Sequence, residues 1–225
     1  MNILAVDTAL SACSVAILAG GRTVVRSMPM PRGHAEALMP MLVGAFAEAG
    51  LEYRDIDRFV VTTGPGTFTG VRVGVAAVRG FALTTGRPAL GVTTLEALAA
   101  TARLRPEAAG QPLLVTMDAR RDEVYAQGFS ADGTPLTEPM VIGIDALLGL
   151  IPDDIGLVFG SAAEAVAAAS SAAGRDLTIL GTESAPDPGA LARLGLDRMP
   201  DAMPKPLYLR APDAKPQAGA ALARK

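Results

Sequence analysis

The segment VTTGPGTFTGVRVG, residues 61–74, places four glycines and a proline between an apolar strand-like run and a helical pattern. The N-terminus of a helix after such a loop can hold an anion, and Thr67 or Thr69 can cap the helix. A phosphate-binding P-loop would end in Gly-Lys-Ser or Gly-Lys-Thr, and this segment contains no lysine. The loop therefore allows an anion but does not require one.

His34 is the only histidine and Cys13 the only cysteine of the chain. A zinc protease of the H-E-x-x-H type needs a second histidine, and a serine hydrolase needs a general base and a G-x-S-x-G turn, which this sequence lacks. A single cysteine forms no intramolecular disulfide, which agrees with a reducing cytoplasm. We therefore predict no metal and no catalytic residue, with His34 as a hydrogen-bonding or capping side chain and Cys13 as a small buried one.

Composition indicates a globular protein that does not bind nucleic acid alone. Half of the 225 residues are hydrophobic and 19% are charged, which excludes disorder across the whole chain. The net charge of -3, the absence of Trp and the 4% of aromatic residues argue against an RNA-binding surface, which needs basic side chains or stacking aromatics. The start MNILAVDTALSACSV has no basic region, and Asp7 interrupts its apolar run, so we expect neither a signal peptide nor a membrane span. We therefore expect a cytoplasmic protein.

The hydrophobic pattern predicts two halves of similar organisation, joined by the polar, Pro-containing stretch RLRPEAAGQP. In the first half we expect strands at 2–8, 13–18, 22–27, 59–63 and 89–92, and helices at 34–49, 69–85 and 95–104. In the second half we expect a strand that ends at Asp118, an alternating strand after it, helices at 145–150 and 162–173, and strands at 156–159 and 178–180. The predicted units are residues 1–104, residues 112–209 as a trimmed copy, and residues 210–225 as a flexible tail.

Two α/β halves that each open with a hairpin whose first strand ends in Asp resemble the duplicated ribonuclease-H-like lobes of the actin, sugar kinase and Hsp70 superfamily, here with a reduced second lobe. The resemblance implies that the first hairpin of each lobe holds nucleotide phosphates by backbone N–H groups. Asp7 and Thr8 fit this role loosely, and they fit a capped turn equally well. Asp118 stands in DARRDEVY, where close approach to phosphate would favour glycine, and Gly160 stands in the adenosine-loop-like FGSAAEA.

Several motifs together are similar to those of the bacterial TsaB (YeaZ) family of tRNA threonylcarbamoyladenosine biosynthesis proteins. They are AVDTALSACSVAIL, HAEALMPML, GPGTFTGVRVG, GVTTLEALA, DARRDEVY and PLYLR, and they span residues 1 to about 210. The resemblance implies a non-catalytic scaffold without a cofactor. Its partners would be TsaD, the catalytic paralogue, and the ATPase TsaE, which together modify adenosine 37 of tRNAs that read ANN codons. The chain would reach tRNA only through this complex.

One departure from the catalytic relative supports the scaffold interpretation. The relative carries H-x-x-x-H at the start of its first helix, where two histidines share a metal. Here His34 is followed four residues later by Leu38. The alternative is a stand-alone ATP-dependent phosphotransferase of the same superfamily that uses Asp7 and Asp118.

Two adjacent helices predict a surface for another subunit. The segment from Ala37 to Ala47 has no charged residue, as in a helix that is buried or part of an interface. Gly70, Gly74, Ala77 and Phe81 fall on one stripe, and a mid-helix glycine such as Gly74 suggests close backbone approach, either to a partner or within the monomer. The predicted interface with the paralogue, or with a second copy of the chain, comprises His34, Leu38, Met41, Leu42, Phe68, Gly70, Arg72, Gly74, Ala77 and Phe81.

Overall fold

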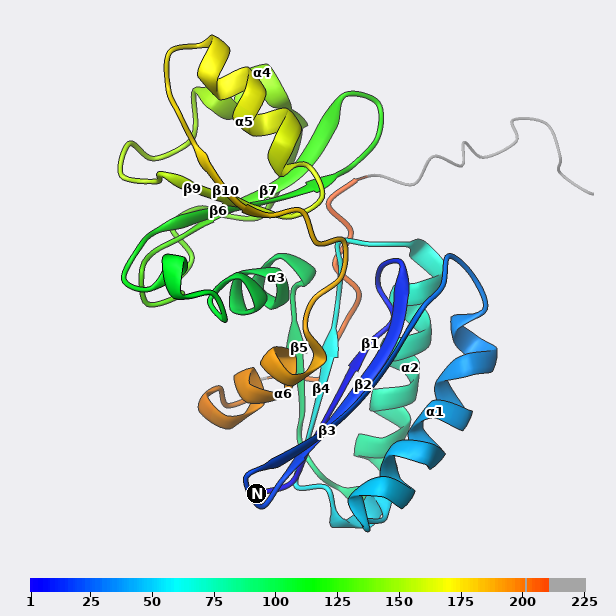
Figure 1. The fold of residues 1–225 in the computed structure, drawn as a ribbon. Coiled ribbons are helices and arrows are strands. Elements are labelled where there is room, and N and C mark those ends of the chain that lie inside the picture. The colour runs from blue at the N-terminus through cyan, green and yellow to red at the C-terminus, as the bar shows by residue number, and fades with distance from the viewer. Residues whose placement is uncertain (201, 211–225) are drawn as a thin grey trace, which may run out of the picture.

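The computed structural model describes residues 1–200 and 202–210, and their strands form two mixed five-stranded sheets (Figure 1). The first sheet contains β1 (Ile3–Asp7), β2 (Ala12–Ala19), β3 (Arg22–Pro29), β4 (Arg58–Thr62) and β5 (Ala89–Val92). The second contains β6 (Leu113–Asp118), β7 (Glu123–Phe129), β8 (Met140–Gly143), β9 (Leu157–Phe159) and β10 (Thr178–Gly181). The predicted tail 211–225 lies outside the described residues.

The two sheets have the same topology. Their strand orders are β3-β2-β1-β4-β5 and β8-β7-β6-β9-β10. In each sheet a long antiparallel hairpin comes first, and the fourth strand then pairs in parallel with the first. This duplication confirms the α/β fold with two ribonuclease-H-like lobes, and the helices after β8 and β9 are shorter than their counterparts in the first lobe.

Helices α1 (His34–Ala49) and α2 (Phe68–Thr85) cover one face of the first sheet, and α4 (Ile144–Leu148) and α5 (Ala163–Ala172) cover the outer face of the second (Figure 1). The first turns of α1 bury His34, Leu38 and Leu42, which are spaced four residues apart and therefore lie on one side of the helix. Short 3₁₀ turns occur at Tyr53–Asp55 and Pro106–Ala108.

The lobes exchange one helix each. Helix α3 (Thr94–Ala102) belongs to the first half but packs on β6, β7 and β9, whereas α6 (Pro188–Asp197) follows the second sheet but packs on β1, β2 and β4 (Figure 1). Leu191 and Ala192 of α6 join a cluster with Ile3 and Val60. The sequence-based unit 112–209 therefore does not coincide with a lobe, because α6 completes the core of the first.

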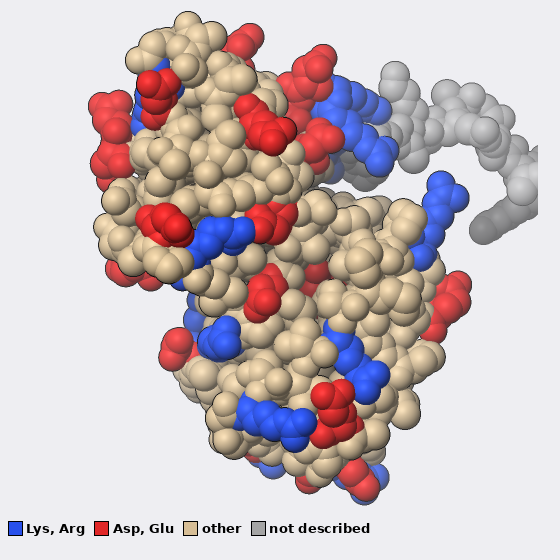
Figure 2. Space-filling view, in the orientation of Figure 1, with Lys and Arg blue, Asp and Glu red and all other residues tan. Residues whose placement is uncertain are grey.

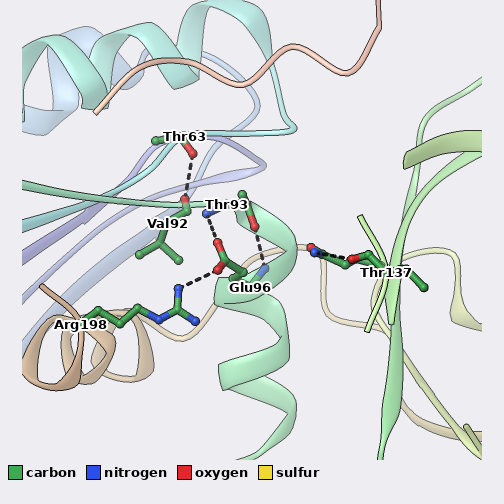
Figure 3. Close-up of polar contacts among 7 residues, drawn as sticks. Thr63, Val92, Thr93, Glu96, Thr137 and Arg198 are labelled. Carbon is green, nitrogen blue, oxygen red and sulfur yellow. Dashed lines mark hydrogen bonds and ion pairs between the residues drawn. The ribbon is translucent and has the colours of Figure 1, made fainter. Parts of the chain in front are cut away.

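Polar contacts join the start of α3 to the end of α6 (Figure 3). Thr93 and Glu96 form a capping box, in which Thr93 N donates to the Glu96 carboxylate at 2.8 Å and Glu96 N donates to the Thr93 hydroxyl at 3.1 Å. Arg198, just after α6, donates to the same carboxylate at 2.6 Å. Beside them, the Thr63 hydroxyl donates to Val92 O at 3.2 Å. The two exchanged helices are thereby fixed to each other between the sheets.

No helix within the described residues combines the length and the hydropathy that crossing a membrane requires.

Candidate functional site

The turn between β1 and β2 is held by contacts within the protein. The Asp7 side chain is completely buried, and its Oδ1 accepts hydrogen bonds from Ala9 N at 3.1 Å and from the Thr62 hydroxyl. Burial raises the pKa of the Asp7 carboxyl, and the hydrogen bonds from Thr62 and Ala9 oppose this shift. The buried Thr8 hydroxyl donates to Gly70 O at 2.7 Å. These contacts match the capped-turn interpretation of the first hairpin.

The second hairpin lines a cleft of about 470 Å³ between the lobes. Its lining residues are Leu10, Gly66, Thr67, Phe68, Met117, Asp118, Ala119, Arg120, Tyr125 and Arg210. Asp118 is exposed, and its carboxylate accepts Arg120 N at 2.7 Å. Arg120, Arg121 and Asp122 have φ values of 61°, 58° and 60°, in the left-handed region that glycine adopts most easily. Large side chains thus occupy the turn where a phosphate-binding hairpin would favour glycine.

Gly160 has a structural reason of its own to be glycine. Its φ is 111°, and a Cβ at this position would collide with the Thr116 carbonyl oxygen of β6. The packing of β6 against the turn after β9 therefore requires glycine here.

His34 and Cys13 are both buried in the first lobe. His34 Nε2 lies 3.1 Å from Leu10 O, so the imidazole connects the start of α1 to the β1–β2 turn. Leu38, one turn further along, lies in the hydrophobic core. Cys13 is fully buried, which confirms the prediction of a small buried side chain, and this burial raises the pKa of its thiol to about 11. Among the described residues no group of three or more His, Cys, Asp or Glu is placed to hold a metal ion.

The glycines at the start of α2 serve packing within the monomer. A Cβ at Gly66 would collide with Ala9 O, and one at Gly70 would collide with Thr8 O. A Cβ at Gly74 would lie 2.6 Å from the Thr8 hydroxyl and 3.2 Å from Val61 Cγ2. Both glycines are buried in this structure, Gly70 against the β1–β2 turn and Gly74 against Thr8, β1 and β4, so their close contacts are made within the monomer. Of the two predicted caps, Thr67 is the one that accepts from Gly70 N.

The other predicted interface residues divide into buried, partly buried and exposed groups. The buried group lies on the side of α1 that faces the sheet and comprises His34, Leu38 and Leu42. These residues therefore do not form part of an exposed surface. Three more residues are partly buried. One of them is Phe81, whose ring stacks on the Phe59 ring with the two ring centres 5.7 Å apart. The partly buried residues are Met41, Ala77 and Phe81. Phe68 and Arg72 are exposed.

Three exposed apolar side chains that the sequence analysis did not select, Met39, Val43 and Leu83, lie with the predicted Phe68 on the outer sides of the same two helices. The exposed fractions are 51% for Met39, 67% for Val43, 53% for Phe68 and 75% for Leu83. Met39 and Val43 follow directly after the buried pair Leu38 and Leu42, so a helical wheel drawn from the buried face would have identified them. We call these four residues the α1–α2 outer face.

Comparisons with known proteins relate the whole chain to one family. A family model described as TsaD, tRNA N6-adenosine threonylcarbamoyltransferase, matches residues 29–189. An Escherichia coli K12 protein named tRNA threonylcarbamoyladenosine biosynthesis protein TsaB is 37% identical over 132 residues, which cover 59% of this chain and 56% of the E. coli protein. An uncharacterised protein of Mycobacterium tuberculosis is 36% identical over 221 residues, 96% of this chain and 95% of that one.

A solved structure has the same architecture over nearly its full length. The structure titled YeaZ from Pseudomonas aeruginosa superposes with a TM-score of 0.76 at 26% identity, covering 92% of this chain and 99% of that chain. The match to the TsaD model agrees with a paralogous relation between the two groups. The chain belongs to the TsaB (YeaZ) family.

Proposed function

We propose that this chain is a non-catalytic accessory subunit of the cytoplasmic machinery that forms N6-threonylcarbamoyladenosine at position 37 of tRNAs reading ANN codons. Membership of the TsaB family supports the pathway, since the E. coli relative is named for the biosynthesis of this nucleoside. The partners would be a TsaD-like catalytic paralogue and a TsaE-like ATPase. In the absence of its partners, the chain would form a homodimer through the same surface that binds the paralogue.

The observation that carries this proposal is the α1–α2 outer face. Met39, Val43, Phe68 and Leu83 are at least half exposed on two neighbouring helices of one lobe. Isolated exposed apolar residues are common, but several exposed apolar and aromatic side chains on two adjacent helices are typical of protein interfaces. The surface fits a helical partner, and a paralogue with the same fold offers an equivalent pair of helices.

The charge distribution supports a role in which partners supply most of the contact with tRNA. Residues 112–187 contain twelve Asp and Glu and only three Arg, whereas residues 1–111 contain eight acidic and ten basic residues. Figure 2 shows many red side chains on the second lobe, at the top of the view. This lobe would repel the phosphate backbone of tRNA.

The experiment combines the purified chain with the TsaD-like and TsaE-like proteins of the same organism, unmodified tRNA, ATP and threonylcarbamoyl adenylate as the group donor, and measures the modified nucleoside in tRNA by mass spectrometry. We expect modification only when this chain is present with its partners, and none from the chain alone. Modification at the same rate without this chain, or by this chain alone, would overturn the proposal.

A stand-alone phosphotransferase is the rival, and one observation favours it: Asp118 lines the cleft between the lobes. The buried Asp7 and the bulky turn at 120–122 argue against it. Calorimetric titration of the isolated chain with ATP and Mg²⁺ separates the two. We expect no binding heat, and micromolar affinity with turnover would favour the phosphotransferase.

A further inference from the structure

Phe68, Arg72 and Tyr208 form an exposed cluster that joins α2 to the C-terminal segment, and we call it the Arg72 cluster. The Arg72 guanidinium lies 3.6 Å from the centre of the Phe68 ring, and its Nε donates to the Tyr208 hydroxyl at 2.8 Å. The two rings are 5.6 Å apart. Although it is held in this way, the cluster stays at the surface, with Phe68 53% and Tyr208 48% exposed.

The C-terminal segment is fixed on both sides of Tyr208. Leu207 N donates to Thr63 O at 2.7 Å, and Arg79 of α2 donates to Pro204 O at 3.2 Å. After Tyr208, Arg210 donates to Ala119 O at 2.8 Å and pairs with Glu123 of the second lobe. These contacts hold the PLYLR motif in place, so the Tyr208 ring and the Arg72 side chain are ordered before any partner arrives.

No carboxylate of the described residues pairs with Arg72, in contrast to Arg26, Arg105, Arg198 and Arg210, each of which forms an ion pair with a glutamate. One hydrogen bond, to Tyr208, uses Nε, which leaves the two terminal nitrogens to act as a donor pair. Two parallel N–H groups of a guanidinium match the two oxygens of a carboxylate. Arg and Tyr are also the residues that most often dominate the binding energy of interfaces.

We infer that the Arg72 cluster is an anchor that receives an Asp or Glu side chain of a partner protein docked on α2. This inference rests on the proposed function, because it identifies the chemistry of one contact with the TsaD-like subunit. It also adds Tyr208, from the far end of the chain, to a surface otherwise made by α1 and α2. The guanidinium lies against the Phe68 ring and 5.8 Å from the centre of the Tyr208 ring, so a partner that covers the two rings would also remove water from the ion pair and strengthen it.

A protein fits this cluster better than RNA does. A single cation contributes little to binding a phosphate backbone, which depends on several basic residues. Along the exposed side of α2 the cluster is followed by Ala76, Gly80 and Leu83, and the next basic residue of the helix, Arg79, is partly buried and already donates to Pro204 O. An Arg in contact with two aromatic rings and beside small apolar residues is typical of the core of a protein interface.

The test measures the affinity of the full chain for the TsaD-like paralogue of the same organism by isothermal titration calorimetry. Arg72→Gln is expected to weaken binding at least about 30-fold, equivalent to about 2 kcal/mol. Tyr208→Phe keeps the ring and loses the hydrogen bond, so a smaller loss is expected. The matched control is Arg87→Gln, which removes the same charge from the exposed residue just beyond the other end of α2 and should leave the affinity unchanged.

The carboxylate is then located by combining Arg72→Gln with neutralisation of each exposed Asp and Glu of the paralogue. One such variant should weaken binding to the wild-type chain and have no further effect on the Arg72→Gln chain. If wild type binds but Arg72→Gln binds equally well, or if no carboxylate couples to it, the inference is overturned and the proposed function stands. If wild type does not bind the paralogue at all, both are overturned. Loss of tRNA binding by the assembled complex, with protein affinity kept, would assign the cluster to RNA and overturn the inference.

Discussion

The hydroxyl of Thr8 donates to the carbonyl oxygen of Gly70 at 2.7 Å, and the backbones there approach so closely that a Cβ on Gly70 would collide with Thr8 O. Thr67 N donates to Ala9 O at 2.7 Å beside this contact. The start of α2 therefore lies directly on the β1–β2 turn, and the glycine-rich loop owes its composition to this packing.

This packing predicts opposite effects for two glycines of α2. In Gly74→Ala the new methyl group meets the Thr8 hydroxyl and Val61, so the free energy of unfolding should fall by about 1–3 kcal/mol. A Cβ at Gly80 meets no atom within 4 Å, so Gly80→Ala should raise it by about 1 kcal/mol through helix propensity alone. Urea denaturation of both variants gives the two values. A Gly74→Ala protein as stable as wild type would show that the glycine is not needed inside the monomer.

Local patterns predicted most elements of the fold. The bounds of α1 (His34–Ala49) and β5 (Ala89–Val92) agree with the sequence analysis, because hydrophobic spacing and flanking glycines or prolines mark their ends. Strand β8 (Met140–Gly143) and helix α6 (Pro188–Asp197) were missed. The Asp187–Pro188 pair, a cap followed by Pro at the first helical position, is a local signal that could have identified α6.

The functional surface was harder to predict than the elements. The sequence showed a stripe of small residues on α2 but not which part of the structure the stripe packs against, because the β1–β2 turn lies more than 50 residues away along the chain. The same limit applies to Tyr208, which meets Arg72 only because α6 carries the chain back to the first lobe. Contacts of this kind depend on tertiary topology, which residue spacing does not encode.

The α1–α2 outer face predicts a variant that loses its partner and keeps its fold. Val43 is 67% exposed at the middle of α1, so Val43→Glu should leave the melting temperature within a few degrees of wild type. A charge placed in an apolar interface should weaken binding to the TsaD-like paralogue at least about tenfold. Leu150→Glu, at a position that is 53% exposed in the second lobe, is the matched control and should bind normally. Equal affinities of the two variants would exclude α1 from the interface.

The buried carboxyl of Asp7 predicts a pH-dependent effect on stability. Because burial raises its pKa in the folded protein, the folded state holds this proton more tightly than the unfolded state does. The charged form therefore destabilises the fold progressively as the pH rises above the unfolded pKa of about 3.9, up to the raised folded value. The Asp7→Asn side chain carries no charge, so the variant lacks this pH-dependent destabilisation. Its amide oxygen can still accept the hydrogen bonds from Ala9 N and the Thr62 hydroxyl. Its stability relative to wild type, from urea denaturation at pH 4 to 8, should increase with pH, and a constant or falling difference would contradict the assignment.

The contacts of Arg58 predict that this side chain stabilises the docking of the exchanged helix α6 on the first lobe. The side chain is buried on β4, and its guanidinium donates to Arg198 O at 2.7 Å, to Gly195 O and to the sulfur of Met199 at 3.2 Å. These acceptors lie at the C-terminal end of α6, where carbonyl oxygens lack helical partners and the helix dipole favours a cation.

Arg58→Leu leaves the carbonyl oxygens of Gly195 and Arg198 without this donor, so we expect a loss of about 2 kcal/mol in the free energy of unfolding. Arg22→Leu, at an exposed position of β3, is the control and should change stability by less than about 0.5 kcal/mol. Hydrogen exchange distinguishes a local effect from a global one, because amides of α6 should lose more protection than those of α1. Equal protection of the two helices in Arg58→Leu would show that Arg58 supports the first lobe as a whole and not the docking of α6.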